Sequence, residues 1–348
     1  LNAILTIVLL QIFLGVWSVA TSLGPLPTTL HLALAAMLLA CTWKIILLLG
    51  SYERSTIVQR ESWLSDYFAL TKPKLALLVL ATALCGMILA KGHLSLLRGA
   101  WALLFIQFVV MGSAALNCVM EKDLDNKMER TKNRPLPDGR LTVSQALTFG
   151  IALCLVGLIG LFLFINWLTA TLATGALVIY LFLYTPLKRK TEMAVFVGAI
   201  PGALPPLIGW TAVTGRLDPV SVSLFFVLYI WQLPHFLAIS LYHADDFRKA
   251  VIYTYPARYG ETATRALILL FTVILVAISL SPTLLKNFSV VYFYTAATLG
   301  VGFFLLSMRG LFSFSPGQLY ARTWARWYFI GSITYLPLLI VTMAFFKL

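Results

Sequence analysis

The chain has 348 residues, of which 60% are hydrophobic and 11% are charged, and its mean hydropathy is +0.90. These values exclude an ordinary water-soluble domain, because so few charged residues cannot cover a surface in water. The net charge of +13 does not indicate nucleic-acid binding, since no soluble basic patch with base-reading elements is visible.

Apolar runs of about 20 residues, the length that crosses a bilayer as a helix, recur along the chain. Within these runs apolar residues follow one another without a break, whereas a transmembrane barrel strand alternates apolar and polar residues. The pattern therefore favours helices over a barrel. The predicted fold class is an all-α polytopic membrane protein, with two N-terminal transmembrane helices before a nine-helix bundle. The predicted helices cover residues 1–20, 28–50, 68–90, 99–120, 145–165, 168–186, 194–213, 219–242, 265–284, 289–308 and 326–346.

A polar stretch divides the chain. It runs from Ser51 to Asp66 and predicts a two-helix segment at 1–50, a linker at 51–66 and a main domain at 67–348. With these helices, one side of the membrane holds twenty Lys and Arg in its loops and the other holds five. The positive-inside rule therefore predicts that the first side is cytoplasmic in a bacterial plasma membrane, with the mitochondrial matrix as the less favoured alternative.

The largest polar interruption, here called the first acidic segment, runs from Asn117 to Arg134. If the preceding helix continues, Asn117, Glu121 and Asp125 fall on one stripe at i, i+4 and i+8, whereas Asp123 points elsewhere. Carboxylate and amide oxygens suit Mg²⁺, and the cations that follow suit phosphate oxygens. These cations are Arg130, Lys132 and Arg134. The alternative is an ordinary solvated loop of mixed charge.

The second acidic segment, Tyr242 to Asp246, follows the predicted helix 219–242 and contains the adjacent pair Asp245 and Asp246. The charge count places it on the same side of the membrane as the first acidic segment. Carboxylates beside hydrocarbon are costly without a cation. The sequence therefore predicts that both segments face one divalent-cation site.

Both segments resemble those of the UbiA superfamily of intramembrane prenyltransferases. Asn117, Glu121 and Asp125 resemble its Asn-x3-Asp-x3-Asp pattern, and residues 130–135 and 242–246 continue the likeness. Within the superfamily, the chain is most similar to the heme O synthases. That likeness rests on residues 71–74 (TKPK), 184–191 (YTPLKRKT), 205–210 (PPLIGW) and 231–236 (WQLPHF). The resemblance covers about residues 66–346 and implies a nine-helix fold.

Two departures from the superfamily pattern concern the metal ligands. Glu121 stands where Asp is usual, which moves the carboxylate out by one methylene, and Asp245 and Asp246 are adjacent instead of four residues apart. The sequence leaves open which of Asp245 and Asp246 ligates the metal.

The resemblance implies an enzyme that transfers farnesyl from farnesyl diphosphate to a vinyl group of haem b, giving haem o. It implies Mg²⁺ on Asn117, Glu121, Asp125, Asp245 and Asp246. The implied diphosphate-binding residues are Arg130, Lys132, Arg134, Lys188 and Arg189. Aromatic faces suited to an allylic cation are Tyr184, Trp231 and Tyr242. His235, inside a hydrophobic helix, is a candidate haem contact.

Two alternatives remain open from the sequence. A UbiA-type enzyme could act on a quinone precursor or chlorophyllide instead of haem. A transporter or haem-handling protein without catalysis is less favoured, because transporters place broken helices near the bilayer midplane, whereas the acidic residues here lie at helix ends.

The first fifty residues resemble the last two helices of a heme A synthase. The likeness rests on residues 11–23 and 28–36, which include His31. In that family the matching histidine ligates a haem with a partner on an earlier helix. The resemblance implies that His31 is a second candidate haem contact and that heme A synthase, or its missing part, is a candidate partner.

Overall fold

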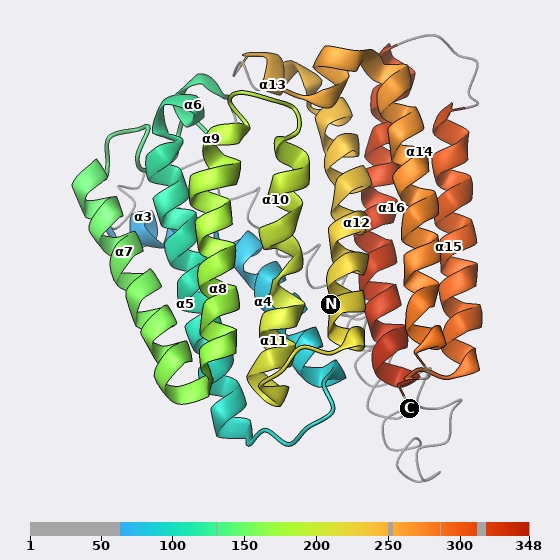
Figure 1. The fold of residues 1–348 in the computed structure, drawn as a ribbon. Helices are drawn as coiled ribbons and strands as arrows, with labels where there is room; N and C mark the ends of the chain where they lie inside the picture. The colour runs from blue at the N-terminus through green and yellow to red at the C-terminus, as the bar shows by residue number, and fades with distance from the viewer. Residues whose placement is uncertain (1–62, 130, 250–252, 286, 312–317, 348) are drawn as a thin grey trace, which may run out of the picture. The chain divides into compact units, whose positions relative to one another are not determined.

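The structure is a computed structural model that describes residues 63–348, apart from 130, 250–252, 286, 312–317 and 348. The predicted N-terminal helices and His31 therefore lie outside the described residues. The rest of the chain forms one compact unit of helices that stand side by side (Figure 1). In the described part, eight helices are long and apolar enough to cross a membrane, or nine if one bent pair counts as a single span.

The first half of this unit contains the bent pair and the helices around it. Their bounds are α3 Trp63–Leu70, α4 Pro73–Leu89, α5 Leu96–Met120, α6 Lys122–Lys127, α7 Val143–Gly160, α8 Trp167–Val178, α9 Thr185–Leu187, α10 Ala194–Ala203 and α11 Pro205–Thr214. The wider turns of π-helix extend α7 over Leu161–Ile165 and join α8 to α9 over Ile179–Tyr184.

The second half contains four long helices and one short one. Their bounds are α12 Pro219–Tyr242, α13 Ala244–Lys249, α14 Tyr255–Leu284, α15 Val290–Leu311 and α16 Gln318–Phe345. Every predicted span of the nine-helix bundle overlaps one of the observed spans, so the all-α polytopic fold is confirmed for the described part. Helices α14 and α16 begin ten and eight residues before their predicted starts, because hydropathy does not detect the polar turns at the membrane surface.

The first predicted core helix is broken. Helices α3 and α4 meet at 47°, and Lys72 between them has left-handed backbone angles, with φ 48°. Pro73 accounts for the break, because a proline disfavours helical angles in the residue before it and donates no N–H. The break directs the Lys72 side chain toward the first acidic segment.

Small residues allow the helix backbones to approach closely. A Cβ added to Gly86 would lie 2.0 Å from the carbonyl oxygen of Pro206, and one added to Gly209 would lie 1.9 Å from that of Ala83. Helices α4 and α11 are therefore in backbone contact. Such contacts stabilise helix pairs in lipid, where the hydrophobic effect does not drive helix association.

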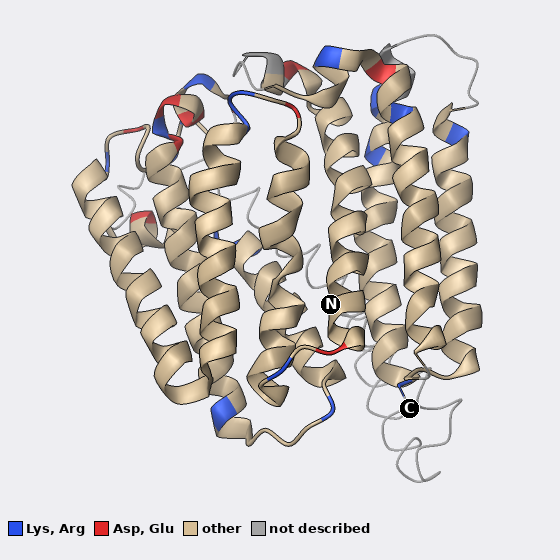
Figure 2. Ribbon diagram, in the orientation of Figure 1, with Lys and Arg blue, Asp and Glu red and all other residues tan. Residues whose placement is uncertain are grey.

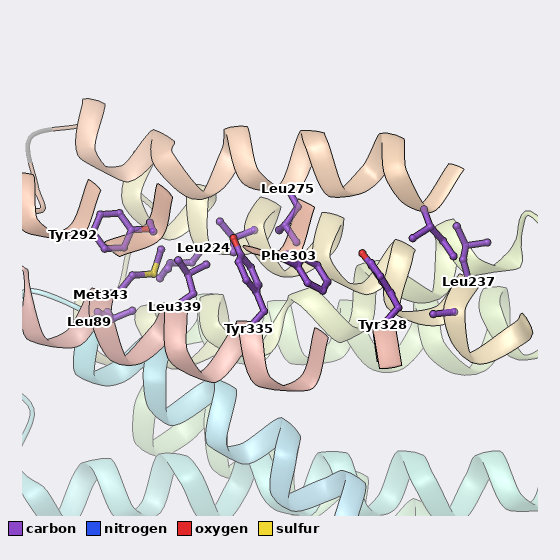
Figure 3. Packing of buried hydrophobic residues seen from close by; sticks show 14 of the residues in the cluster. Leu89, Leu224, Leu237, Leu275, Tyr292, Phe303, Tyr328, Tyr335, Leu339 and Met343 are labelled. Atoms are coloured by element: carbon purple, nitrogen blue, oxygen red, sulfur yellow. The ribbon is translucent and has the colours of Figure 1, made fainter. Parts of the chain in front are cut away.

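A buried cluster joins α4, α12, α14, α15 and α16 (Figure 3). Its tyrosine hydroxyls have partners: Tyr292 donates to the Ser279 carbonyl at 2.5 Å and Tyr335 donates to the Ser279 hydroxyl at 2.9 Å. Since an unpaired hydroxyl in hydrocarbon is costly, these bonds let aromatic side chains fill the core.

Charged residues gather at the two ends of the helices, as Figure 2 shows. Helices α6 and α13, which belong to the two acidic segments, lie at the same end of the bundle (Figures 1 and 2). This end is called the site end below.

Candidate functional site

The row of Asn117, Glu121 and Asp125 keeps its helical spacing although the helix is interrupted at Glu121. Helix α5 ends at Met120, and Glu121 has non-helical angles before α6 begins. The Glu121 N–H still donates to the Asn117 carbonyl, and the Asp125 N–H still donates to the Glu121 carbonyl, at 3.0 and 2.8 Å. All three side chains are buried, whereas Asp123 is exposed, so the row forms one inward-facing stripe.

Asn117 connects three elements. Its side-chain oxygen Oδ1 accepts from Lys72 Nζ at 2.6 Å. Its side-chain nitrogen Nδ2 donates to Glu121 Oε1 at 2.8 Å and to Thr185 Oγ1 at 3.1 Å. The Thr185 hydroxyl in turn donates to the Tyr180 carbonyl at 2.8 Å, which satisfies a carbonyl in the π-helical turn. The wide turn thus places Thr185 against Asn117.

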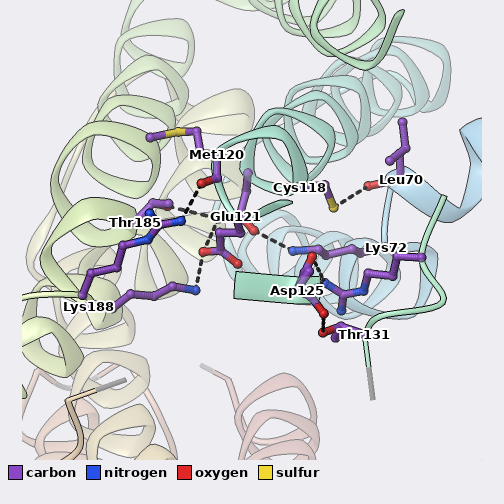
Figure 4. A network of polar contacts seen from close by, with 12 residues as sticks. Leu70, Lys72, Cys118, Met120, Glu121, Asp125, Thr131, Thr185 and Lys188 are labelled. Carbon is purple, nitrogen blue, oxygen red and sulfur yellow. Dashed lines mark hydrogen bonds and ion pairs between the residues drawn. The ribbon is translucent and has the colours of Figure 1, made fainter. Parts of the chain in front are cut away.

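Glu121 forms a buried ion pair with Lys188, which follows α9 (Figure 4). Burial pushes the pKa of Glu121 upward, but the nearby Lys188 and Lys72 ammonium groups, with hydrogen bonds from Lys188 and Asn117, outweigh burial. The pKa of Glu121 is therefore lower than usual, and its carboxylate is charged at neutral pH. The Lys188 ammonium also lies 5.8 Å from the centre of the Tyr184 ring, within cation–π range.

Asp125 and Arg134 form an ion pair in which one guanidinium nitrogen contacts both carboxylate oxygens. Arg134 Nη1 lies 2.9 and 2.8 Å from the two carboxylate oxygens, and Thr131 donates to the Asp125 backbone carbonyl at 2.8 Å. Lys132 instead pairs with Glu129 at 2.6 Å on the surface, and Arg130 lies outside the described residues. Of the predicted cations in the first acidic segment, the structure therefore brings Arg134 into the buried row.

Two further residues were missed as candidates. Lys72 lies in the TKPK motif that supports the family resemblance, but its role needs the left-handed break that directs its ammonium group to Asn117. Thr185 precedes the predicted cations Lys188 and Arg189 by a few residues. Arg189 donates to the Met120 carbonyl at 2.8 Å, so the segment after α9 is bound to the end of α5 at two points.

The second acidic segment is less buried. Asp245 pairs with Arg322 of α16 at 2.8 Å, and its side chain is 52% exposed. Asp246 lies in α13, and the described residues do not include its side chain. The ring of Tyr242 packs edge-on against His243 at 4.5 Å between centroids. Both acidic segments lie at the site end (Figures 1 and 2).

The donor types in the buried row fit a hard cation. Carboxylate oxygens of Glu121 and Asp125 and the amide oxygen of Asn117 are the ligand types that Mg²⁺ prefers. Among the described side chains, no three His, Cys, Asp or Glu residues converge on one metal position. Instead, the ammonium and guanidinium groups of Lys72, Lys188 and Arg134 contact these oxygens, so cations already compensate the buried acids.

His235 lies deeper in the bundle, at the contact between α12 and α16. The Ser332 hydroxyl donates its one proton to the Phe329 carbonyl at 2.7 Å, so it can only accept from His235 Nδ1, also at 2.7 Å. This assigns the proton to Nδ1 and leaves a lone pair on Nε2. Trp231 stacks on the imidazole at 4.6 Å between centroids and donates to the Ser332 carbonyl at 2.9 Å.

Comparison with known proteins identifies the family of the chain. The UbiA prenyltransferase family matches residues 79–345. A protein of Myxococcus xanthus named protoheme IX farnesyltransferase is 42% identical over 280 residues, which cover 80% of this chain and 94% of that protein.

Two solved structures share the fold. A digeranylgeranylglyceryl phosphate synthase has a TM-score of 0.69 at 20% identity and covers 81% of this chain and 98% of its own. A UbiA homologue from Archaeoglobus fulgidus, bound to GPP and Mg²⁺, has a TM-score of 0.59 at 18% identity and covers 78% of this chain and 99% of its own. Since the family match spans most of the sequence and the fold is shared, this chain belongs to the UbiA prenyltransferase family.

Proposed function

We propose that this protein transfers a farnesyl group from farnesyl diphosphate to a vinyl group of haem b, giving haem o and diphosphate. The proposal rests on the buried row of Asn117, Glu121 and Asp125, in a UbiA-family chain 42% identical to a protoheme IX farnesyltransferase. The row lies at the end of an apolar bundle, where a charged diphosphate can stay near water while its prenyl tail enters the membrane.

A divalent metal is proposed to be held by Asn117, Glu121 and Asp125 from one side and by Asp245 and Asp246 from the other. The solved Archaeoglobus fulgidus homologue with GPP and Mg²⁺ supports Mg²⁺ as the metal. When bound, Mg²⁺ would supply positive charge to the diphosphate leaving group.

The chain's own cations are proposed to bind the phosphate oxygens that remain. Arg134 and Lys188 now contact Asp125 and Glu121, and they can turn to phosphate once these carboxylates have another cation. Arg130, Lys132 and Arg189 are proposed to add positive charge for the same ligand. Preformed positive charge favours the step in which the allylic C–O bond breaks and its electron pair leaves with diphosphate.

The allylic cation needs electron-rich faces and protection from water. Tyr184 already has the Lys188 ammonium above its ring, so it can accept a cation by the same cation–π attraction. Trp231 and Tyr242 are candidates on α12. The vinyl π electrons of haem then form the new C–C bond, and water adds to the resulting cation and loses a proton, which gives a hydroxyethylfarnesyl group.

His235 is proposed to contact the haem acceptor. Its Nε2 lone pair can ligate the iron, while Ser332 holds the proton on Nδ1. Helix α12 contains both His235 and Tyr242, so one helix connects the proposed haem contact with the second acidic segment.

Mass spectrometry of the porphyrin product tests the proposal directly. Purified protein incubated with haem b, farnesyl diphosphate and Mg²⁺ is expected to yield a product heavier than haem b by one farnesyl group and one hydroxyl group, and chelation of the metal should abolish it. Turnover of a quinone precursor or chlorophyllide without haem turnover would favour the alternative acceptors. Full turnover by both Asn117→Ala and Asp125→Ala would refute the proposed metal site.

We also propose a bacterial plasma membrane location with the site end in the cytoplasm, because most Lys and Arg of the predicted loops lie on that side. A heme A synthase is the proposed partner, since its substrate is the proposed product. Cysteine labelling at Lys127 and at Arg216, in intact cells and in lysed cells, tests the orientation: a Lys127→Cys variant should react only after lysis.

A further inference from the structure

Glu192 is a buried carboxylate outside the row described above. It lies in the connection between α9 and α10 and is 4% exposed. Its Oε2 accepts from Arg258 Nη1 at 3.0 Å, and its Oε1 accepts from the Tyr259 hydroxyl at 3.1 Å. The neighbouring Thr191 hydroxyl donates to Oε2 at 3.3 Å. A buried carboxylate at a membrane surface is costly unless it has such partners.

The partners of Glu192 come from a distant part of the chain. Arg258 and Tyr259 lie in the first turns of α14, just before Gly260, whose φ of 83° breaks the helix. Further into the bundle, Phe196 of α10 packs edge-on against Phe271 of α14 at 5.9 Å between centroids. Helices α10 and α14 are thus connected by an aromatic contact within the membrane and by the Glu192 contacts at the site end.

The other end of the same connection binds the first acidic segment. Lys188 pairs with Glu121, and Arg189 donates to the Met120 carbonyl, four and three residues before Glu192. Residues 188–192 therefore join the α5–α6 junction to the start of α14. Helix α14 follows α13, which contains Asp245 and Asp246. The short connection thus bridges the two chain regions proposed to meet at the diphosphate.

We infer that Glu192 is a positioning residue for the prenyl diphosphate: by binding Arg258 and Tyr259, it holds Lys188 and the second acidic segment at the separation that the diphosphate requires. The inference rests on the proposed function, because it assigns these two regions to one substrate. Glu192 itself does not touch the substrate, since its oxygens are already occupied by α14 and Thr191.

Steady-state kinetics with both substrates varied separately test this role. Glu192→Gln keeps the size of the side chain and an acceptor for Tyr259, so it removes charge alone. We expect the KM for farnesyl diphosphate to rise about tenfold, while kcat falls less and the KM for haem is unchanged, because only diphosphate positioning is affected. A double variant with the charges exchanged, Glu192→Arg with Arg258→Glu, should recover part of the loss.

The matched control is Glu261→Gln, which removes a carboxylate from the same turns of α14. Glu261 pairs with Arg265 within that helix and does not join it to α10, so both KM values should stay near wild type. Equal changes of the two KM values in Glu192→Gln, or an unchanged KM for farnesyl diphosphate, would overturn the inference. A wild-type protein that fails to prenylate haem would contradict the proposed function instead, so the two failures are distinguishable.

Discussion

Asp125 of the first acidic segment and Asp245 of the second both pair with an arginine at 2.8 Å, but their side chains are 6% and 52% exposed. The first segment is a buried network in which Lys72, Lys188 and Arg134 each contact one member of the Asn117, Glu121 and Asp125 row. In the second segment, Asp245 lies at the surface and pairs with Arg322 of α16. We call the two segments the buried and the surface half-site of the proposed diphosphate site, and we expect the buried one to be preformed and the surface one to be completed when substrate and metal bind.

The largest effect is expected for Asp125→Ala, which tests whether the buried carboxylate is needed for activity. The change removes a proposed metal ligand and leaves Arg134 without its carboxylate, so we expect kcat/KM to fall about 10³-fold. The matched control is Asp123→Ala, two residues earlier and exposed, which should stay within about twofold of wild type. Equal losses in the two variants would mean that burial does not mark the functional carboxylate.

Lys188→Met tests whether the buried half-site needs its internal cations. Glu121 would lose its ion-pair partner while still buried, which costs about 3–5 kcal/mol in such pairs and lowers the thermal unfolding midpoint. We expect kcat/KM to fall about 10²-fold. Adding Glu121→Gln should restore the unfolding midpoint but not the activity, and Lys190→Met, at an exposed neighbour, should change neither.

Asp245→Ala tests the surface half-site. An exposed ion pair contributes about 1 kcal/mol or less, so the unfolding midpoint should hardly move. We expect kcat/KM to fall about tenfold, through a weaker affinity for Mg²⁺ measured by titration of the metal. A wild-type Mg²⁺ dependence in this variant would show that Asp245 does not ligate the metal. Arg322→Ala, which removes only the partner, should have a smaller effect.

Ser332→Ala has the smallest expected effect and concerns the acceptor side of α12. Losing one net hydrogen bond of about 0.5–1.5 kcal/mol frees the His235 proton to occupy either nitrogen. We expect the KM for haem to rise about threefold, with no change in the KM for farnesyl diphosphate. Ser332→Thr keeps the hydroxyl and should behave like wild type. An unchanged KM for haem would contradict the proposed role of the His235–Ser332 contact at the acceptor.

Much of the first half-site was predictable from local spacing. The i, i+4, i+8 pattern placed Asn117, Glu121 and Asp125 on one stripe and separated them from Asp123, because backbone hydrogen bonds preserve the helical register even through the break at Glu121. The second half-site was less predictable. The sequence around Asp245 and Asp246 does not show that Arg322 of α16 pairs with Asp245.

By itself, the sequence determined that the described part of the chain is a bundle of membrane-spanning helices with its two acidic segments at one end. Lipid allows no unpaired backbone groups, so long apolar runs must be helices and charges must lie at their ends. Only the tertiary structure decided which side-chain oxygen each cation contacts: Lys72 that of Asn117, Lys188 that of Glu121, and Arg258 that of Glu192. These partners lie 45 to 67 residues apart, and helix packing, not local spacing, sets such distances.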